Sequence, residues 1–351
     1  MDADKPLLKK KYYPINEVLS DYLHKYKRVT KTTIFYEDLL RFQGSVVVTD
    51  KNDEDTLWVR VFHNEFERKE IDLSLKKIYT LLHSDGDESN LKFLTVDYID
   101  FCTFGNSKPF RIKIRNTLND NYTHFYVKKA DASRIFGLEL EHILSPNSIN
   151  FLVFKETLIE EHIVGIPGDV FLKHHLHNCT EHEKAQIAKE FVKFNERCMI
   201  GLLGDMRSYN FVVIPIYDYD HIVFKIRAID FDQQCYEGSF KLYKPHLYKE
   251  NFLFTQLVHD KLKENSIEQY QKEERSIMVR RLAGSEERLK DLLFAMKSNE
   301  LSPTLNLELL KKETFEVTKD KYFKNAKSMG ELVEAALNYI KRNYHHLEDD
   351  E

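Results

Sequence analysis

The feature that most constrains the fold is the order of apolar runs between Leu91 and Ile166. Three runs alternate apolar and polar residues as strands do, and short segments rich in turn-forming residues separate them. A run with helical spacing follows and ends before Pro146, because proline cannot continue a helix. Two further apolar runs complete the order, so we expect an antiparallel sheet with one inserted helix. The expected strands lie at 91–104, 110–116, 122–131 and within 149–166, and the expected helix at 132–145.

The segments on either side of this region differ from it in pattern. The first 90 residues mix helical and strand-like runs and end in the turn-rich sequence SDGDESN, which places a boundary near Asn90. Beyond residue 166 the spacing becomes mainly helical, interrupted by a strand-like pair within 211–232. The sequence therefore predicts an α+β protein with an N-terminal α/β extension at 1–90, a β-rich region at 91–165 and a mainly helical region at 166–351.

Composition narrows the class of protein. Hydrophobic residues make up 42% of the 351 residues and charged residues 31%, the balance of a folded globular protein. The 52 basic residues nearly balance the 57 acidic ones, so charge gives no reason to expect nucleic acid or an anionic membrane as a partner. No run is apolar enough for a signal peptide or a membrane span, and the four cysteines form no CxxC pair. We therefore expect a cytoplasmic protein.

Polar residues gather in two short loops of the helical region. Asp205 and Asn210 lie five residues apart in the sequence GDMRSYN, after a long helical run, and Asp230 follows the strand-like run FKIRAI. Phosphoryl transfer from ATP requires a carboxylate that orients the accepting hydroxyl, and oxygen ligands for Mg²⁺. The two loops supply both kinds of side chain.

These loops resemble the catalytic and metal-binding loops of the protein-kinase-like superfamily, whose pattern is Asp-x-x-x-x-Asn followed by a strand that ends in Asp-Phe-Gly. The form found here, GDMRSYN followed by AIDFD, is more similar to the aminoglycoside and choline phosphotransferases and to the toxin-module Ser/Thr kinases. The resemblance runs in order from about Leu91 to Gln234. It implies a two-lobed kinase-like fold, with a β-rich N-lobe at 91–165, a mainly helical C-lobe at 166–351 and ATP in the cleft.

The resemblance assigns roles in catalysis and metal binding residue by residue. Asp205 matches the catalytic carboxylate, and Arg207 falls where many kinases keep a basic residue near the transferred phosphate. Asn210 and Asp230 match the Mg²⁺ ligands, and Asp232 is a candidate for a further metal or water contact.

A second group of residues is implied in nucleotide binding. The run HFYVKK resembles the strand whose lysine holds the α- and β-phosphates, and Lys128 and Lys129 are both candidates because they point to opposite faces of a strand. We favour Lys128, the first polar residue after the apolar run. The sequence LIEEHIVGIPGDVF resembles the hinge of small-molecule kinases, so the backbone at Glu161, His162 and Ile163 is expected to hold adenine.

The lysine of such a fold pairs with a glutamate on the following helix, and Glu139 and Glu141 are both available. On a helix of 3.6 residues per turn, Glu139 lies nearer the expected core face than Glu141 does. We therefore favour Glu139. The residues that define this face are Phe136, Leu140, Ile143 and Leu144.

The sequence departs from the superfamily pattern at three places. No Gly-x-Gly-x-x-Gly loop joins the first two strands, where FGNSKPF offers Asn106, Ser107 and Lys108 as substitutes. Leu203 replaces the usual histidine before Gly-Asp, and no Ala-Pro-Glu-like segment follows Asp230. The last absence favours phosphotransfer in general over peptide substrates in particular.

The expected function is thus an ATP- and Mg²⁺-dependent phosphotransferase that acts on a hydroxyl of a small molecule or protein. The sequence leaves two alternatives open. A pseudokinase would use the same fold as a nucleotide-binding scaffold or interaction module, and some members of the superfamily transfer a nucleotidyl group instead of phosphate. No nucleic acid or membrane partner is expected.

Overall fold

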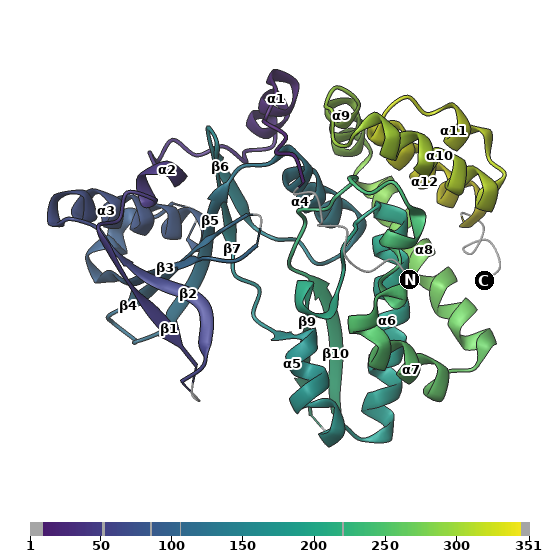
Figure 1. Cartoon of the computed structure of the whole chain (residues 1–351), viewed down its shortest axis with the longest axis horizontal. Helices are drawn as coiled ribbons and strands as arrows, with labels where there is room; N and C mark the ends of the chain where they lie inside the picture. Colours follow the sequence, from purple (N-terminus) through teal and green to yellow (C-terminus); the bar gives the residue numbers. More distant parts are fainter. Residues whose placement is uncertain (1–9, 51–52, 85, 106, 220, 345–351) are drawn as a thin grey trace. The chain divides into compact units, whose positions relative to one another are not determined.

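The computed structural model describes two compact units, each treated separately below (Figure 1). Unit 1 comprises Met1–Asp131 and Asn150–His162, and unit 2 comprises Ala132–Ile149 and Ile163–Glu351. Unit 1 consists mainly of strands and unit 2 mainly of helices. This confirms the α+β class and the predicted order of a β-rich part before a helical part. The residues that the structure describes are 10–50, 53–84, 86–105, 107–219 and 221–344.

Unit 1 is built on a seven-stranded antiparallel sheet with the strand order β1-β2-β3-β4-β5-β7-β6. The predicted order of three strands, a helix and two strands is present. The first two strands come from the predicted N-terminal extension. The first pairs with the second, and the second pairs with β3, so the sheet continues across the boundary expected near Asn90. The strands are β1 (Gly44–Thr49), β2 (Asp55–Phe62), β3 (Leu94–Cys102), β4 (Phe110–Asn116), β5 (Tyr122–Lys129), β6 (Phe151–Phe154) and β7 (Thr157–Glu161).

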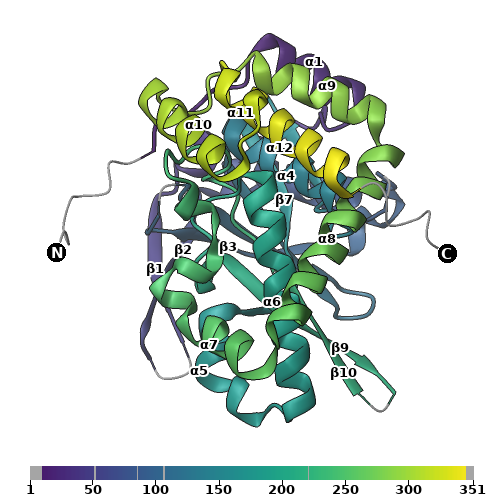
Figure 2. The ribbon, with the colours of Figure 1, turned by 90° about the vertical axis from the view of Figure 1, so that its right-hand side faces the viewer.

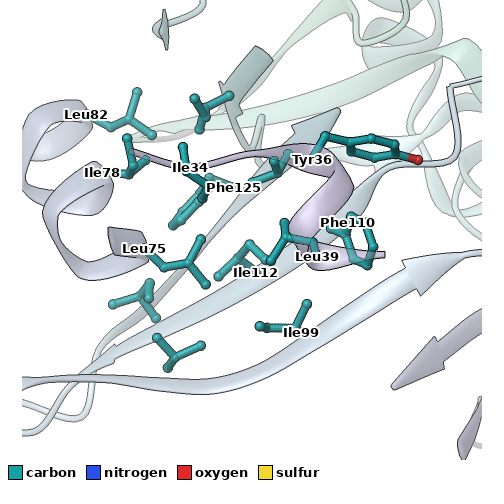
Figure 3. Close-up of a cluster of buried hydrophobic side chains, with 14 of the residues drawn as sticks. Ile34, Tyr36, Leu39, Leu75, Ile78, Leu82, Ile99, Phe110, Ile112 and Phe125 are labelled. Atoms are coloured by element: carbon teal, nitrogen blue, oxygen red, sulfur yellow. The ribbon is translucent and has the colours of Figure 1, made fainter. Parts of the chain in front are cut away.

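One face of this sheet packs against helices of the same unit (Figure 3). Helix α3 (Glu65–His83) contributes Leu75 and Ile78, which are fully buried, as are Ile112 and Phe125 of the sheet. Because side chains alternate along a strand, the neighbouring polar residues of β4 and β5 lie on the opposite face. Unit 1 also contains α1 (Glu17–Lys25), α2 (Tyr36–Leu39) and the 3₁₀ helix η1 (Glu88–Phe93).

Helix α4 (Ala132–Leu144) belongs to unit 2, although the strands before and after it belong to unit 1. The predicted helix and its apolar face are confirmed, but the polar side is buried as well, including Arg134 and Glu139. Gly137 allows this helix to approach the segment that follows β10, since a Cβ there would lie 2.9 Å from the Cβ of Phe231. A buried helix with charged residues needs a partner for each charge.

Unit 2 is organised around the long helix α6 (Glu181–Gly201) (Figure 2). This helix packs against α7 (Phe252–Lys261), α8 (Glu264–Gly284) and β10 (His221–Ala228). A capping box of Thr180 and Glu183 starts α6, and Leu202, with a φ of 53°, ends it in the left-handed conformation. A small antiparallel sheet has the order β10-β9-β8, with β8 (Ile166–Pro167), β9 (Phe211–Asp218) and β10 (His221–Ala228).

The remaining helices of unit 2 confirm the predicted change to mainly helical structure. None of the helices in the described part of the chain combines the length and hydropathy needed to cross a bilayer. The helices are α5 (Gly168–His174), α7 (Phe252–Lys261), α8 (Glu264–Gly284), α9 (Glu286–Lys297), α10 (Thr304–Thr318), α11 (Lys321–Asn325) and α12 (Met329–Tyr344), with 3₁₀ turns η2 (Leu176–Asn178), η3 (Ser208–Asn210), η4 (Phe240–Tyr243), η5 (Pro245–Leu247) and η6 (Lys249–Asn251).

Candidate active site

Backbone pairing joins the two polar loops of unit 2. Where α6 ends, Leu203 forms an antiparallel bridge with Gln234, and the N–H of Cys235 donates to the carbonyl of Leu202 at 2.9 Å. The amide of the Gln234 side chain also donates to the carbonyl of Gly201 at 2.5 Å. The loop after α6 and the loop after β10 are therefore held together at the ends farthest from the hairpin.

The β9–β10 hairpin joins the same loops at their other ends. Its register pairs Phe211 with Ala228, and the N–H of Ile229 donates to the carbonyl of Asn210 at 3.0 Å. Asn210 immediately precedes β9, and Asp230 follows Ile229. The hairpin thus brings together the backbone positions of the two residues predicted to bind metal.

Asp205 is fixed by several hydrogen bonds. Its Oδ1 accepts from the Nε of Arg207 at 2.7 Å, its carbonyl accepts from the Nδ2 of Asn210 at 2.7 Å, and its N–H donates to the hydroxyl of Tyr248 at 3.0 Å. The φ of Asp205 is 56°, a left-handed conformation that aspartate tolerates better than most residues. Burial raises the pKa of this carboxyl, while Arg207 opposes the shift. The site therefore holds a carboxylate whose proton affinity is higher than usual.

Arg207 donates hydrogen bonds to two carboxylates, those of Asp205 and Glu250. Its Nη1 donates to the Oε1 of Glu250 at 2.9 Å, and its guanidinium lies 5.2 Å from the centre of the Tyr248 ring. Glu237 is a further nearby carboxyl, since a Cβ at Gly204 would lie 3.1 Å from its Cγ. Burial, and then Asp205, raise the pKa of Glu237. Tyr248, Glu250 and Glu237 belong to no motif and follow the loop of Asp205 at a distance, so the sequence alone does not reveal them.

The two aspartates after β10 share a buried arginine. The Nη1 of Arg134 donates to the Oδ1 of Asp230 at 2.7 Å and to the Oδ1 of Asp232 at 2.8 Å. Its Nη2 donates to the carbonyl of Ile229 at 3.3 Å, and Arg134 is only 1% exposed. Sequence reasoning did not find Arg134, because a single arginine near the start of a helix carries no signal of its own.

The candidate metal ligands are chemically suited to Mg²⁺. Within the described part of the chain, no group of three or more His, Cys, Asp or Glu side chains is arranged to hold a metal ion. The predicted donors are Asp230, Asp232 and the amide of Asn210. Mg²⁺ commonly takes one or two carboxylates and completes its octahedron with phosphate and water oxygens. Because Asn210 donates through its Nδ2, its amide oxygen is the atom that would serve a metal. The donor set fits the ion, with Arg134 as a competing cation.

Lys128 is the buried member of the predicted lysine pair in unit 1. It is 6% exposed, and its Nζ lies 2.9 Å from the Oε2 of Glu160 on the neighbouring strand β7. Lys129 is exposed and lies 3.8 Å from Glu156 and 4.0 Å from Glu37. The alternation along β5 thus separates the two lysines as expected.

Each residue of the predicted pair Lys128 and Glu139 has a partner within its own unit. Glu139 receives three hydrogen bonds from Arg288 of α9, with distances of 2.6 to 2.9 Å, while Lys128 pairs with Glu160. Glu141, the alternative, accepts from the hydroxyl of Ser145 at 2.7 Å. Helix α4 buries its polar side as well as its apolar side, and it packs against α6, α8 and α9 of unit 2.

The predicted hinge is the segment where the chain passes from unit 1, at His162, to unit 2, at Ile163. The N–H of Glu161 donates to the carbonyl of Asn150 at 2.9 Å, and that of His162 donates to the carbonyl of His124 at 3.3 Å. Two of the three backbone amides expected to face adenine are therefore used within the sheet.

The substitutes for a glycine-rich loop are only partly described. Asn106 lies outside the described residues. Ser107 is half-buried, and the carbonyl of Lys108 accepts a hydrogen bond from the hydroxyl of Tyr36 at 2.8 Å. The described part of this loop therefore gives no separate support for a phosphate-binding role.

We expect the free energy of unfolding to fall in acid, because the pKa values of two histidines of unit 1, His124 and His162, are lowered. The pKa of His124 is lowered to about 4 by burial and then by His162, Arg111 and Lys113. The unfolded chain takes up this proton below the ordinary histidine pKa of about 6.5, whereas the folded chain stays neutral down to about 4. We expect the urea midpoint of unfolding to fall as pH drops through this window, and His124→Phe to reduce the fall. Equal pH dependence in both proteins would contradict this.

Comparison with known proteins gives little further guidance. No protein-family model matches the chain, and no curated protein matches it. The solved structures that match include a Plasmodium vivax ethanolamine kinase, with 13% sequence identity, coverage of 81% of this chain and 92% of that chain, and a TM-score of 0.31. At this TM-score the likeness supports no conclusion about function, so the candidate site is judged by its own geometry.

Proposed function

We propose that this protein is a kinase-like phosphotransferase that transfers the γ-phosphoryl group of ATP, with Mg²⁺, to a hydroxyl of a small molecule or a protein. The observation that carries the proposal is the backbone hydrogen bond from Ile229 to Asn210. It joins the loop of Asp205 to the loop of Asp230. The two ends of one hairpin therefore place a carboxylate for the acceptor near oxygen atoms that can bind a metal ion.

Asp205 would act on the acceptor. In an in-line displacement, the acceptor oxygen bonds to the γ-phosphorus, the bond to ADP breaks, and Asp205 receives the hydroxyl proton. Its raised pKa supports proton acceptance, because a general base works best when its pKa approaches the working pH. Arg207, held by Asp205 and Glu250, would fix the orientation of the carboxylate.

The nucleotide and the metal would be held by other side chains. When bound, Mg²⁺ neutralises charge on the phosphates. Asn210 and Asp230 are its proposed ligands, with Asp232 as an additional donor. Lys128 is proposed as a phosphate ligand only because its strand resembles the lysine-bearing strand of the superfamily. Its ammonium group would then contact both the phosphates and Glu160.

Labelled ATP tests the proposal directly. The full chain is incubated with Mg²⁺, a set of hydroxyl-bearing small molecules and proteins, and ATP that carries ³²P at either the γ or the α position. Transfer of the γ label, with release of ADP, is the expected result. Transfer of the α label would replace phosphotransfer by nucleotidyl transfer.

A nucleotide-binding scaffold is the second candidate. Two observations favour it. Arg134 donates hydrogen bonds to both Asp230 and Asp232, and the backbone N–H groups of Glu161 and His162 already donate to carbonyls within unit 1. Stabilisation of the protein by ATP and Mg²⁺ in a thermal-shift assay, with no transfer of either label, would establish this alternative over the enzyme.

A further inference from the structure

Arg134 stands out among the charged residues because it is buried and serves two carboxylates at once. The side chain of Arg134 is 2% exposed, whereas those of Asp230 and Asp232 are 36% and 18% exposed. A single Nη1 atom contacts one oxygen of each aspartate. The buried guanidinium thus contacts two carboxylates that are both more exposed than it is.

The position of Arg134 is fixed by the helix that carries it. Helix α4 is anchored at Glu139 by Arg288 and at its C-terminal carbonyls by Arg281, which donates to His142 at 2.9 Å and to Ile143 at 3.2 Å. Gly137 allows close contact with the loop after β10. A displacement of α4 would have to disturb these contacts, so the backbone of Arg134 is held beside the loop after β10.

We propose that Arg134 is an internal cation that competes with divalent metal for Asp230 and Asp232, so that metal binds tightly only when a nucleotide adds its phosphate oxygens. This inference rests on the proposed function. Arg134 is a positioning residue here, because it acts through the two aspartates. A guanidinium held against two carboxylates offsets part of their negative charge, which weakens their attraction for a divalent ion.

The nucleotide restores the lost affinity. Mg²⁺ and Mn²⁺ prefer oxygen donors, and ATP contributes phosphate oxygens and negative charge to the same coordination shell. The metal and the nucleotide should therefore bind the wild-type chain with strong positive coupling. Without Arg134, the aspartates attract the metal by themselves, and the coupling becomes smaller.

Manganese binding provides a test that needs no turnover. Free Mn²⁺ is followed by electron paramagnetic resonance during titration of the full-length wild type and of Arg134→Gln, each with and without a nonhydrolysable ATP analogue. We expect Arg134→Gln to bind Mn²⁺ alone at least about tenfold more tightly than the wild type does. We also expect the analogue to tighten Mn²⁺ binding more in the wild type than in the variant.

A matched control is Arg275→Gln, which breaks another buried ion pair of unit 2, the 2.7 Å contact between Arg275 of α8 and Glu196 of α6. Its Mn²⁺ affinity should equal that of the wild type. The gain in Arg134→Gln should disappear when Asp232→Asn is added. Equal Mn²⁺ affinity in wild type and Arg134→Gln overturns the proposal.

A second variant of Arg134 and the measurement with Mn²⁺ alone allow the proposal to be tested in two further cases. If Arg134→Gln does not fold, Arg134→Met replaces it, because methionine removes the charge and keeps a flexible, unbranched side chain. We then expect the same gain in Mn²⁺ affinity, and no gain overturns the proposal. If the wild type binds no analogue at all, the proposed function fails, while the comparison with Mn²⁺ alone still decides the role of Arg134.

Discussion

Asp205→Asn is expected to lower the rate of phosphoryl transfer by at least about a hundredfold, with ATP affinity changed by less than about threefold. Asparagine keeps the shape of the side chain and can still accept a hydrogen bond from Arg207, but it cannot take the hydroxyl proton. The backbone contacts of Asp205 with Asn210 and Tyr248 are unaffected by the change. Initial rates with γ-labelled ATP and calorimetric titration of the nucleotide measure the two quantities.

Glu250→Gln is the matched control for this experiment. Glu250 contacts the same guanidinium at 2.9 Å, and glutamine keeps an oxygen acceptor for it. We expect this variant to retain at least about a tenth of the wild-type rate. An unchanged rate in Asp205→Asn removes Asp205 from the mechanism. Equal losses in both variants would show that the orientation of Arg207, and not proton acceptance by Asp205, controls the rate.

The elements of this fold follow from local sequence patterns. Alternation in FRIKIRN fixes both the strand and its buried face, because Phe110, Ile112 and Ile114 must reach one side of the sheet together. The short loop of GDMRSYN and the strand FKIRAI likewise place Asn210 and Asp230 at the two ends of one hairpin. These relations span few residues, so periodicity and turn chemistry are sufficient to predict them.

The partners of the charged residues do not follow from such patterns. Arg134 is nearly a hundred positions from Asp230, and Arg288 is still farther from Glu139. Helical periodicity indicates which side of α4 is apolar, but it treats the polar side as exposed to water. Because that side is buried too, each charge is neutralised by a residue that only the tertiary packing brings near. For this reason the sequence did not reveal Glu160 as a partner of Lys128, or Arg288 as a partner of Glu139.

Arg288→Met is expected to lower the free energy of unfolding of unit 2 by about 3–5 kcal/mol. Glu139 is fully buried, so removal of Arg288 leaves its carboxylate without the guanidinium that compensates it. A buried charge that loses its partner costs far more than the pair contributes when intact. Urea titration followed by circular dichroism should show a lower midpoint, and Lys129→Met, which changes an exposed residue, should leave the midpoint nearly unchanged.

The double variant Arg288→Met with Glu139→Met separates a structural role of Glu139 from a role at the nucleotide. Replacement of both charges by apolar side chains removes the uncompensated carboxylate, so most of the lost stability should return. If Glu139 serves only to anchor α4, the double variant also binds ATP with wild-type affinity. Recovered stability with lost ATP binding would instead mean that Glu139 takes part in nucleotide binding, as the sequence suggested. A single variant as stable as the wild type would contradict the burial of this pair.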